Sequence, residues 1–278
     1  MRRLGRSLGA KPEECVALSD TTCDEQPPCN GRRRLVATLP LALVASAVLP
    51  ASPARAALPP LPPSGEQRFR VYYGDRSRDL VVAEIDYRLR NGGDTYEVAT
   101  RGKAVGMVAI FYSGVLIQTS VGRVGDKGLL PERYSERRGK RPERVIEFDH
   151  RRGKMIGRGT PPEVELVPGT QDRLSVFYQV GLLARGNPEL LQPGRRFTVP
   201  LASMKEIDKA SFLVVGEEAV ETERGRVAAV RLTVRNEADP DDPTIDAWLA
   251  TDLSLLPARI RISEDDGKVI DQVLVPAA

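Results

Sequence analysis

The stretch VVAEIDYRL at positions 81–89 decides the expected fold class. From Val81 onward every second side chain is apolar, and those between are mostly charged. A period of two is typical of an antiparallel strand with one face in the core and one in water. The turn-forming residues 91–94 (NGGD) follow, and Tyr96-Glu97-Val98 then begins a second alternating run. The segment therefore predicts a β-hairpin.

The same alternation recurs on both sides of this hairpin. We expect an earlier strand at 69–73 and a second hairpin at 145–156 that turns at 150–153. Residues 104–114 are apolar and contain glycine, which predicts either a short helix or a strand. Gly225 and Gly267 mark further hairpin turns. The remaining expected strands lie at 212–215, 228–234, 245–249, 258–262 and 269–275.

One segment, 172–184, has a helical period instead. Asp172 is a suitable residue for the helix N-terminus, and four large apolar residues fall near one face, namely Leu174, Phe177, Tyr178 and Leu182. A single helix beside many strands predicts a mainly β fold. We expect an antiparallel curved sheet or barrel with one main covering helix, because a sheet that curls around itself buries its apolar face.

The N-terminal part has the three-part order of a signal peptide. Arg32–Arg34 are basic, 35–49 is a mostly apolar run, and Ala54-Arg55-Ala56 gives small residues around a cleavage site after Ala56. The apolar run is shorter than the roughly 20 residues that span a bilayer. An uncleaved membrane anchor is the alternative. The arginines fit the general secretory route and also a twin-arginine signal, so the export route stays open.

These features divide the chain into three parts. Residues 1–56 are expected to be an N-terminal extension with the signal peptide, 57–66 a proline-rich linker, and 67–278 a single β-rich domain. All three cysteines lie within 1–31, so the predicted mature chain has no disulfide. Either translation starts near the arginines at 32–34 or the n-region is unusually long, and both alternatives stay open. We expect a periplasmic protein whose mature chain has no transmembrane segment.

Charge excludes one class of partner. The chain has 41 basic and 38 acidic residues, of which 1–56 hold 8 and 5, so the predicted mature chain has 33 of each. The net positive charge of +3 belongs to the leader and does not indicate nucleic-acid binding. Aromatic residues are also sparse around the basic segment 133–158, which argues against stacking on single-stranded nucleic acid.

Four segments resemble a known family. They are the opening strand with 80–89, the stretch 128–134 (GLLPERY) with the hairpin around Phe148, the stretch 172–178 (DRLSVFY), and 246–252 (DAWLATD) with 256–260 (LPARI). Their order is similar to that in the exported bacterial proteins of domain of unknown function 3108. The resemblance covers most of the predicted mature chain. It implies export and a β-rich domain, and it implies no reaction and no functional residues.

Two sets of residues are candidates for binding. Five apolar or aromatic residues are candidates for lining a ligand pocket inside the curved sheet, although each could equally be core: Tyr87, Ile110, Phe111, Phe177 and Tyr178. Five arginines are candidates for an anion-binding patch toward lipid headgroups, lipopolysaccharide phosphate or acidic glycans: Arg137, Arg138, Arg141, Arg151 and Arg152. A pair of solvated hairpins explains the arginines more simply.

No catalytic, cofactor or metal site is expected. His150 is the only histidine and falls in a turn, where a solvated residue is the simpler interpretation. The acidic run 237–246 lacks the glycine and glutamate spacing of an EF-hand loop and reads as a flexible loop. Asp172 is better explained as a helix cap than as a catalytic acid, and Trp248 as core rather than as a sugar platform.

These observations favour a non-enzymatic periplasmic protein. It would bind an apolar or amphipathic envelope ligand, with a lipid as the candidate, or assist envelope assembly. A protein–protein interaction module of the envelope, which uses an exposed strand edge or the basic hairpin, is the second hypothesis. A carbohydrate-active enzyme is the third, and it needs two carboxylates that face one cleft.

Overall fold

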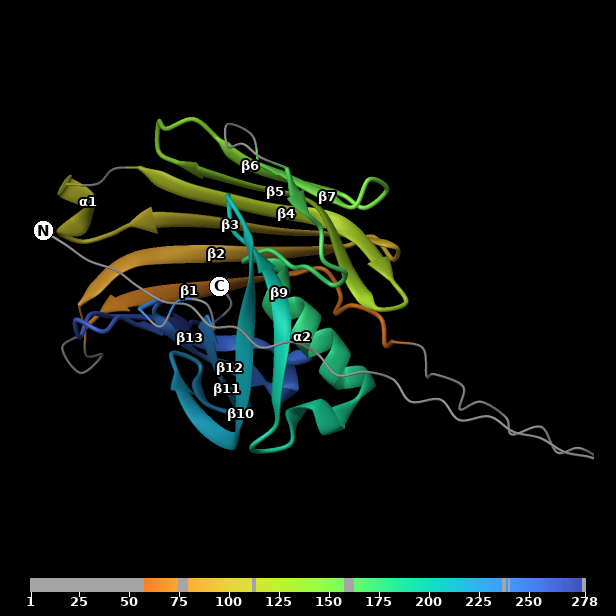
Figure 1. The fold of residues 1–278 in the computed structure, drawn as a ribbon. Coiled ribbons are helices and arrows are strands. Elements are labelled where there is room, and N and C mark those ends of the chain that lie inside the picture. Colours follow the sequence, from red (N-terminus) through yellow and green to blue (C-terminus); the bar gives the residue numbers. More distant parts are fainter. Residues whose placement is uncertain are drawn as a thin grey trace, which may run out of the picture. The chain divides into compact units, whose positions relative to one another are not determined.

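A computed structural model describes residues 58–74, 80–111, 114–157, 163–236, 239 and 241–276, without the side chain of Phe111. The predicted signal peptide, its cleavage site and the three cysteines lie outside these residues. The described residues belong to one compact unit. Most of them form strands of a single sheet, and Figure 1 shows this sheet curling around helix α2 (Ser175–Gly186).

The sheet has 14 strands among the described residues, and each neighbouring pair runs antiparallel. The order is β8-β7-β6-β5-β4-β3-β2-β1-β14-β13-β12-β11-β10-β9. The two end strands do not pair with each other, so the sheet is curved and open, not a closed barrel. This confirms the mainly β fold class.

The first eight strands form one half of the sheet. They are β1 (Gly65–Tyr73), β2 (Val81–Asn91), β3 (Thr95–Ala104), β4 (Val115–Gly125), β5 (Gly128–Arg138), β6 (Arg144–Asp149), β7 (Lys154–Gly157) and β8 (Val164–Glu165). One turn of helix, α1 (Val108–Phe111), connects β3 to β4.

The last six strands form the other half. They are β9 (Arg196–Ala202), β10 (Ile207–Thr222), β11 (Gly225–Asn236), β12 (Thr244–Ala250), β13 (Leu256–Ser263) and β14 (Val269–Leu274). In Figure 1, β9 and β10 run across the direction of β2–β5. The tip of the β10–β11 hairpin reaches the end of β14, where the N–H of Glu223 donates to the carbonyl of Leu274 at 3.0 Å.

Both ends of the sheet are poor templates for a further strand. β8 has only two residues, and short edge strands limit pairing with other chains. β9 contains Pro200, which has no N–H and is tolerated on an edge. The carbonyl of Pro200 accepts the N–H of Gln171, and the carbonyl of Gln171 accepts the N–H of Ala202, each at 2.8 Å. The segment before α2 therefore covers part of this edge.

Helix α2 lies between the two halves and separates two apolar clusters. Leu174, Tyr178 and Leu182, spaced four apart, pack with β2–β7 residues. Val176 and Val180 pack with residues of β9–β12. A helix that is apolar on both sides is buried on both sides. Phe177 packs with the β9–β12 cluster, although Leu174 and Tyr178 beside it pack with the β2–β7 cluster.

The outer face of the sheet carries cross-strand ion pairs. Directly opposed examples are Arg88 with Glu66 at 2.7 Å and Arg68 with Asp86 at 2.6 Å. Trp248 is buried on this face between Arg231 and Arg259, whose guanidinium carbons lie 5.3 and 5.1 Å from its ring centre. Opposite charges on facing strands stabilise the sheet.

Several local expectations can be compared with this fold. Residues 104–114 contain the end of β3 and the helical turn α1, and 172–184 contains the start of α2. The described part of the proline-rich segment before β1 belongs to no helix or strand, and Leu61 packs into the β2–β7 cluster. Asn91 donates to the carbonyls of Leu61 and Pro62 at 3.1 and 3.0 Å, which holds the segment against the domain.

Candidate functional site: a pocket beside helix α2

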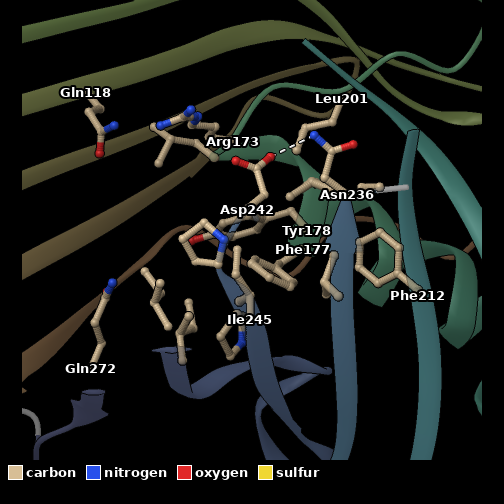
Figure 2. A pocket seen from close by; sticks show the side chains of 18 of the residues that line it. Gln118, Arg173, Phe177, Tyr178, Leu201, Phe212, Asn236, Asp242, Ile245 and Gln272 are labelled. Carbon is tan, nitrogen blue, oxygen red and sulfur yellow. Dashed lines mark hydrogen bonds between the residues drawn. The ribbon is translucent and has the colours of Figure 1, made fainter. Parts of the chain in front are cut away.

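A pocket of about 410 Å³ lies on the inner side of the sheet against the N-terminal half of α2. Figure 2 shows Phe177, Tyr178, Phe212 and Ile245 along one part of its wall. Ligand pockets commonly occupy roughly 300–1,000 Å³ and combine apolar walls with a few polar groups. Apolar lining residues come from both halves of the sheet and from α2: Phe69, Leu174, Val176, Phe177, Leu201, Ala202, Ala210, Phe212, Val234, Ile245, Ile260 and Ile262.

Aromatic rings form three contacts in and beside the wall. Phe212 stacks on Phe197 with ring centres 5.1 Å apart and meets the edge of Phe177 at 6.4 Å. Phe69 meets Tyr87 edge-on at 5.1 Å. Burial raises the pKa of Tyr87 to about 12, so its hydroxyl stays protonated at neutral pH and donates to Gln272 at 3.2 Å. The wall therefore presents rings and amides without a formal charge at this point.

Charged side chains lie at other places in the lining. Arg173 is exposed and has no hydrogen bond or ion pair with any residue that the structure describes. Asp242 accepts a hydrogen bond from Asn236 at 2.7 Å, as the dashed line in Figure 2 marks. Burial raises the pKa of Asp208, and the nearby charges of Glu206, Asp242 and Asp239 raise it further. The pocket thus offers apolar contact together with both signs of charge.

A buried hydrogen-bond network fixes the start of α2 beside the pocket. Oδ1 of Asp172 accepts the N–H groups of Leu174 and Ser175 at 2.8 and 3.0 Å, and Oγ of Ser175 accepts the N–H of Asp172 at 2.9 Å. This is the reciprocal arrangement of a capping box. Ser120 donates to Oδ2 of Asp172 at 2.6 Å and lies 3.1 Å from the hydroxyl of Tyr96. The network connects α2 to β3 and β4.

Burial raises the pKa of Asp172, while the hydrogen bonds from Ser120, Ser175 and Leu174 act in the opposite direction. The carboxyl group is fully buried, so its charged form loses the solvation that water provides. The geometry assigns this group to holding the helix, and the group is not part of the lining of the pocket.

A second attachment holds the middle of α2. Oε1 of Gln179 accepts the N–H of Leu129 at 2.6 Å, and its Nε2 donates to the carbonyl of Lys127 at 3.0 Å. Gly128, between them, has φ +104°, and a Cβ there would lie 2.1 Å from Oε1 of Gln179. A glycine is therefore required for the helix to bond to the β4–β5 turn. These two attachments set where Phe177 and Tyr178 face.

The structure brings together three of the five residues predicted for a pocket. Tyr87, Phe177 and Tyr178 all contribute to the lining. Ile110 does not: it lies on α1, its exposed fraction is 77%, and it is absent from the lining. The side chain of Phe111 lies outside the described residues.

The structure divides the predicted anion patch. Arg137, Arg138 and Arg141 lie at the β5–β6 turn, whereas Arg151 and Arg152 lie at the β6–β7 turn. These turns are at opposite ends of the six-residue strand β6, which at about 3.3 Å per residue spans roughly 16–20 Å. Arg138 pairs with the buried Glu136 at 2.9 Å, and Arg152 with Glu163 at 2.9 Å. The five arginines therefore do not form one surface.

Further candidate residues occupy structural positions. His150 is exposed in the β6–β7 turn and its Nε2 lies 2.6 Å from the carbonyl oxygen of Pro131. In the described ranges, no group of three or more His, Cys, Asp or Glu could hold a metal ion. No helix there is long and apolar enough to cross a bilayer.

Most lining residues were not foreseen from the sequence. Gln118 of β4 lines the pocket and donates to the hydroxyl of Tyr134 at 2.7 Å, although a polar residue in a predicted strand usually faces water. Phe212, Val234 and Ile245 lie in three successive strands of the second half. Alternation showed that one face of each strand is buried. It carried no signal that these faces meet α2.

Comparisons with known proteins give a family and a fold. The model of the family described as "Protein of unknown function (DUF3108)" matches residues 68–273. No curated protein matches the chain. A β-barrel-like protein of domain of unknown function DUF1849 from Brucella abortus is similar in structure, with 13% identity and a TM-score of 0.50 over 78% of this chain and 97% of that one. This likeness concerns the fold.

Two further structures are more distant. A candidate exported protein with a YmcC-like fold from Bacteroides fragilis has 12% identity and a TM-score of 0.36 over 79% of this chain and 97% of that one. A candidate lipoprotein from Parabacteroides distasonis has 8% identity and a TM-score of 0.31 over 78% and 97%.

Proposed function

The chain belongs to the DUF3108 family, and we propose that it is a non-enzymatic periplasmic protein that binds an apolar or amphipathic ligand of the cell envelope. The single observation that supports this proposal is the pocket of about 410 Å³ between α2 and the curved sheet. Its volume lies within the range of about 300–1,000 Å³ that is common for ligand pockets, and its lining combines apolar walls with a few polar groups.

The lining indicates the chemistry of the ligand. Phe177, Phe212 and Ile262 offer apolar surface to a chain or ring, and burying such surface contributes roughly 25 cal/mol per Å². Arg173 and Asp242 offer charge to a polar headgroup. An amphiphile with an apolar body and a polar head satisfies both parts of the lining, whereas a fully polar ligand would leave the rings without a partner.

Displacement of a fluorescent probe tests this proposal. We expect N-phenyl-1-naphthylamine to bind in the pocket and an envelope lipid extract to displace it. Ile262→Trp fills the pocket from a half-buried position on β13 and should reduce probe binding at least ten-fold. Val215→Trp adds the same ring at an exposed position that does not line the pocket and should leave binding unchanged. Equal binding by both variants would contradict a ligand site in this pocket.

Strand pairing with another envelope protein receives less support. The edge strand β8 has two residues, and β9 contains Pro200 and is bonded to Gln171. Both features limit strand addition. If neither the probe nor a lipid binds in the pocket, binding of a protein partner through the basic β5–β6 and β6–β7 turns is the favoured alternative.

A carbohydrate-active enzyme is a second candidate because one observation favours it. Asp208 and Asp242 both line the pocket, and the pKa of Asp208 is raised by burial and by neighbouring acids. Glycoside hydrolysis uses two carboxyl groups that flank one bond, one of them protonated. The test is hydrolysis of chromogenic glycosides by the wild type and by Asp208→Asn and Asp242→Asn. Turnover that both substitutions abolish would replace the binding proposal. If the wild type does not hydrolyse these glycosides, the binding proposal is favoured over the enzyme.

A further inference from the structure

A group of exposed apolar side chains lies at the end of the sheet where β3 turns into β4. Met107 and Ile110 have exposed fractions of 75% and 77%, and Val108 of 37%. They belong to the one-turn helix α1 and the residue before it. Large apolar side chains exposed side by side in a soluble domain mark a surface that meets an apolar partner.

Basic residues border this group on one side. The N–H of Gly139 in the β5–β6 turn donates to the carbonyl of Val115 at 2.9 Å, and Gly139 approaches the backbone of Gly114. The β5–β6 turn therefore adjoins Gly114 and Val115 at the start of β4. Lys140 and Arg141 lie in this turn and Arg137 lies at the end of β5, and Figure 1 shows α1 and the β5–β6 turn at the same end of the sheet.

These cations differ from the others on the outer face. Other basic residues there form ion pairs, as in Lys103 with Glu84 at 3.4 Å and Arg133 with Glu143 at 3.2 Å. Arg137, Lys140 and Arg141 are exposed and form no ion pair with any residue in the described ranges. The local acids are already paired, so positive charge remains at this end of β5.

We propose that this end of the sheet docks onto a membrane surface that contains anionic lipids. Met107 and Ile110 enter the boundary between headgroups and acyl chains, and Arg137, Lys140 and Arg141 contact the phosphates. Shallow apolar insertion combined with basic residues is the general chemistry of peripheral membrane binding. The docking surface consists of α1 residues and the β5–β6 turn. The docking surface is separate from the pocket. The proposal of membrane docking can therefore be tested independently of the proposed ligand.

Vesicle sedimentation tests the docking surface, with protein isolated from a periplasmic extract. We expect binding to vesicles that contain phosphatidylglycerol, weaker binding to phosphatidylcholine alone, and loss of binding at high salt. The triple variant Arg137→Gln/Lys140→Gln/Arg141→Gln should bind about 100-fold more weakly, since each basic residue near an anionic surface contributes roughly a factor of five. The double variant Met107→Ser/Ile110→Ser should lose about ten-fold or more.

A charge-matched variant provides the control. Arg151→Gln/Arg195→Gln/Arg196→Gln removes the same charge from exposed positions on elements away from α1 and should bind as the wild type does. Circular dichroism checks that all variants remain folded. Two results would overturn the proposal: no binding of the wild type to anionic vesicles, or an equal loss of binding in both triple variants. Probe displacement from the pocket should be unchanged in every variant.

Discussion

Asp172 shows how one buried residue can organise the site without lining it. Its carboxylate caps α2, accepts a bond from Ser120 and is fully buried. In each of these bonds the carboxylate oxygens of Asp172 accept the hydrogen, which lowers the pKa of the group. Burial destabilises the charged form and raises the pKa. The side chain loses its contact with water and in return fixes the first turn of α2. That turn places Leu174 and Phe177 in the pocket wall.

Two substitutions of Asp172 distinguish the contribution of the helix cap to stability from the contribution of the charge. Asp172→Ala removes the cap and leaves Ser120 and two N–H groups without their partner, which we expect to lower the free energy of unfolding by about 2–4 kcal/mol. Asp172→Asn keeps an acceptor for the helix and a donor for Ser120, so it should cost less than about 1 kcal/mol. Urea unfolding at neutral pH measures both. Equal losses would contradict the capping role.

The raised pKa of Asp172 predicts a pH dependence with a definite sign. Between the lower pKa of the unfolded chain and the higher pKa of the folded chain, the folded state binds more protons. The contribution of Asp172 is therefore complete below the unfolded pKa and is lost as pH rises through the folded pKa. The stability of wild type relative to Asp172→Asn should fall over that window. Urea unfolding of both proteins at a series of pH values measures the difference, and a rise would contradict burial as the dominant cause.

At the scale of elements, α2 is the component that turns a curved sheet into a sheet with a pocket. It is fixed at its start by Asp172 and in its middle by Gln179, and it contacts β5 and β13 on opposite halves. Gly181 lets it approach the carbonyl of Leu255 closely, since a Cβ there would lie 2.7 Å from that oxygen. The helix therefore contacts both halves of the sheet.

A matched pair of glycine substitutions tests this attachment. Gly128 and Gly225 both have positive φ, +104° and +98°, so alanine is strained at each by about 1–2 kcal/mol. Only at Gly128 would the Cβ displace Gln179, while nothing lies within 4 Å at Gly225. Gly128→Ala should therefore lower stability by about 1–3 kcal/mol more than Gly225→Ala. Chemical denaturation measures the difference, and equal costs would mean that Gln179 does not hold the helix.

Sequence patterns predicted the strands that alternate cleanly and missed those that do not. The hairpin β2–β3 was recognised because apolar and charged residues alternate along it and NGGD marks its turn. β4 was missed because its inward residues include Gln118 and Ser120, which bond to Tyr134 and Asp172. β9 was missed because Pro200 argues against a central strand, and β9 is in fact an edge strand.

At the scale of the whole described unit, two halves of one open sheet bury their inner faces against the same helix. The inner faces form separate apolar clusters on either side of α2, and the pocket lies where the clusters fail to fill the space. The outer face is covered by cross-strand ion pairs. The exposed apolar and basic residues at α1 and the β5–β6 turn are the exception that the proposed docking surface uses.

The pocket could be predicted only in part because it is a long-range feature. Tyr87 and Tyr178 were identified as aromatic residues on inward faces, and the sheet and helix place them together. The opposite wall depends on how far the sheet curls, which brings Phe212 and Ile245 to α2 from strands late in the chain. Local alternation reports burial and not the partner across the core. Ile110 illustrates the error that follows when apolar character alone is used.

The most direct test of the ligand-binding account is native mass spectrometry of the protein purified from a periplasmic extract, with organic extraction of bound molecules. The account predicts one lipid or other amphiphile per protein, retained by Val215→Trp and absent from Ile262→Trp. A wild-type protein that is empty as isolated and remains empty after incubation with envelope lipids would contradict it. That result would shift the function to the protein surface.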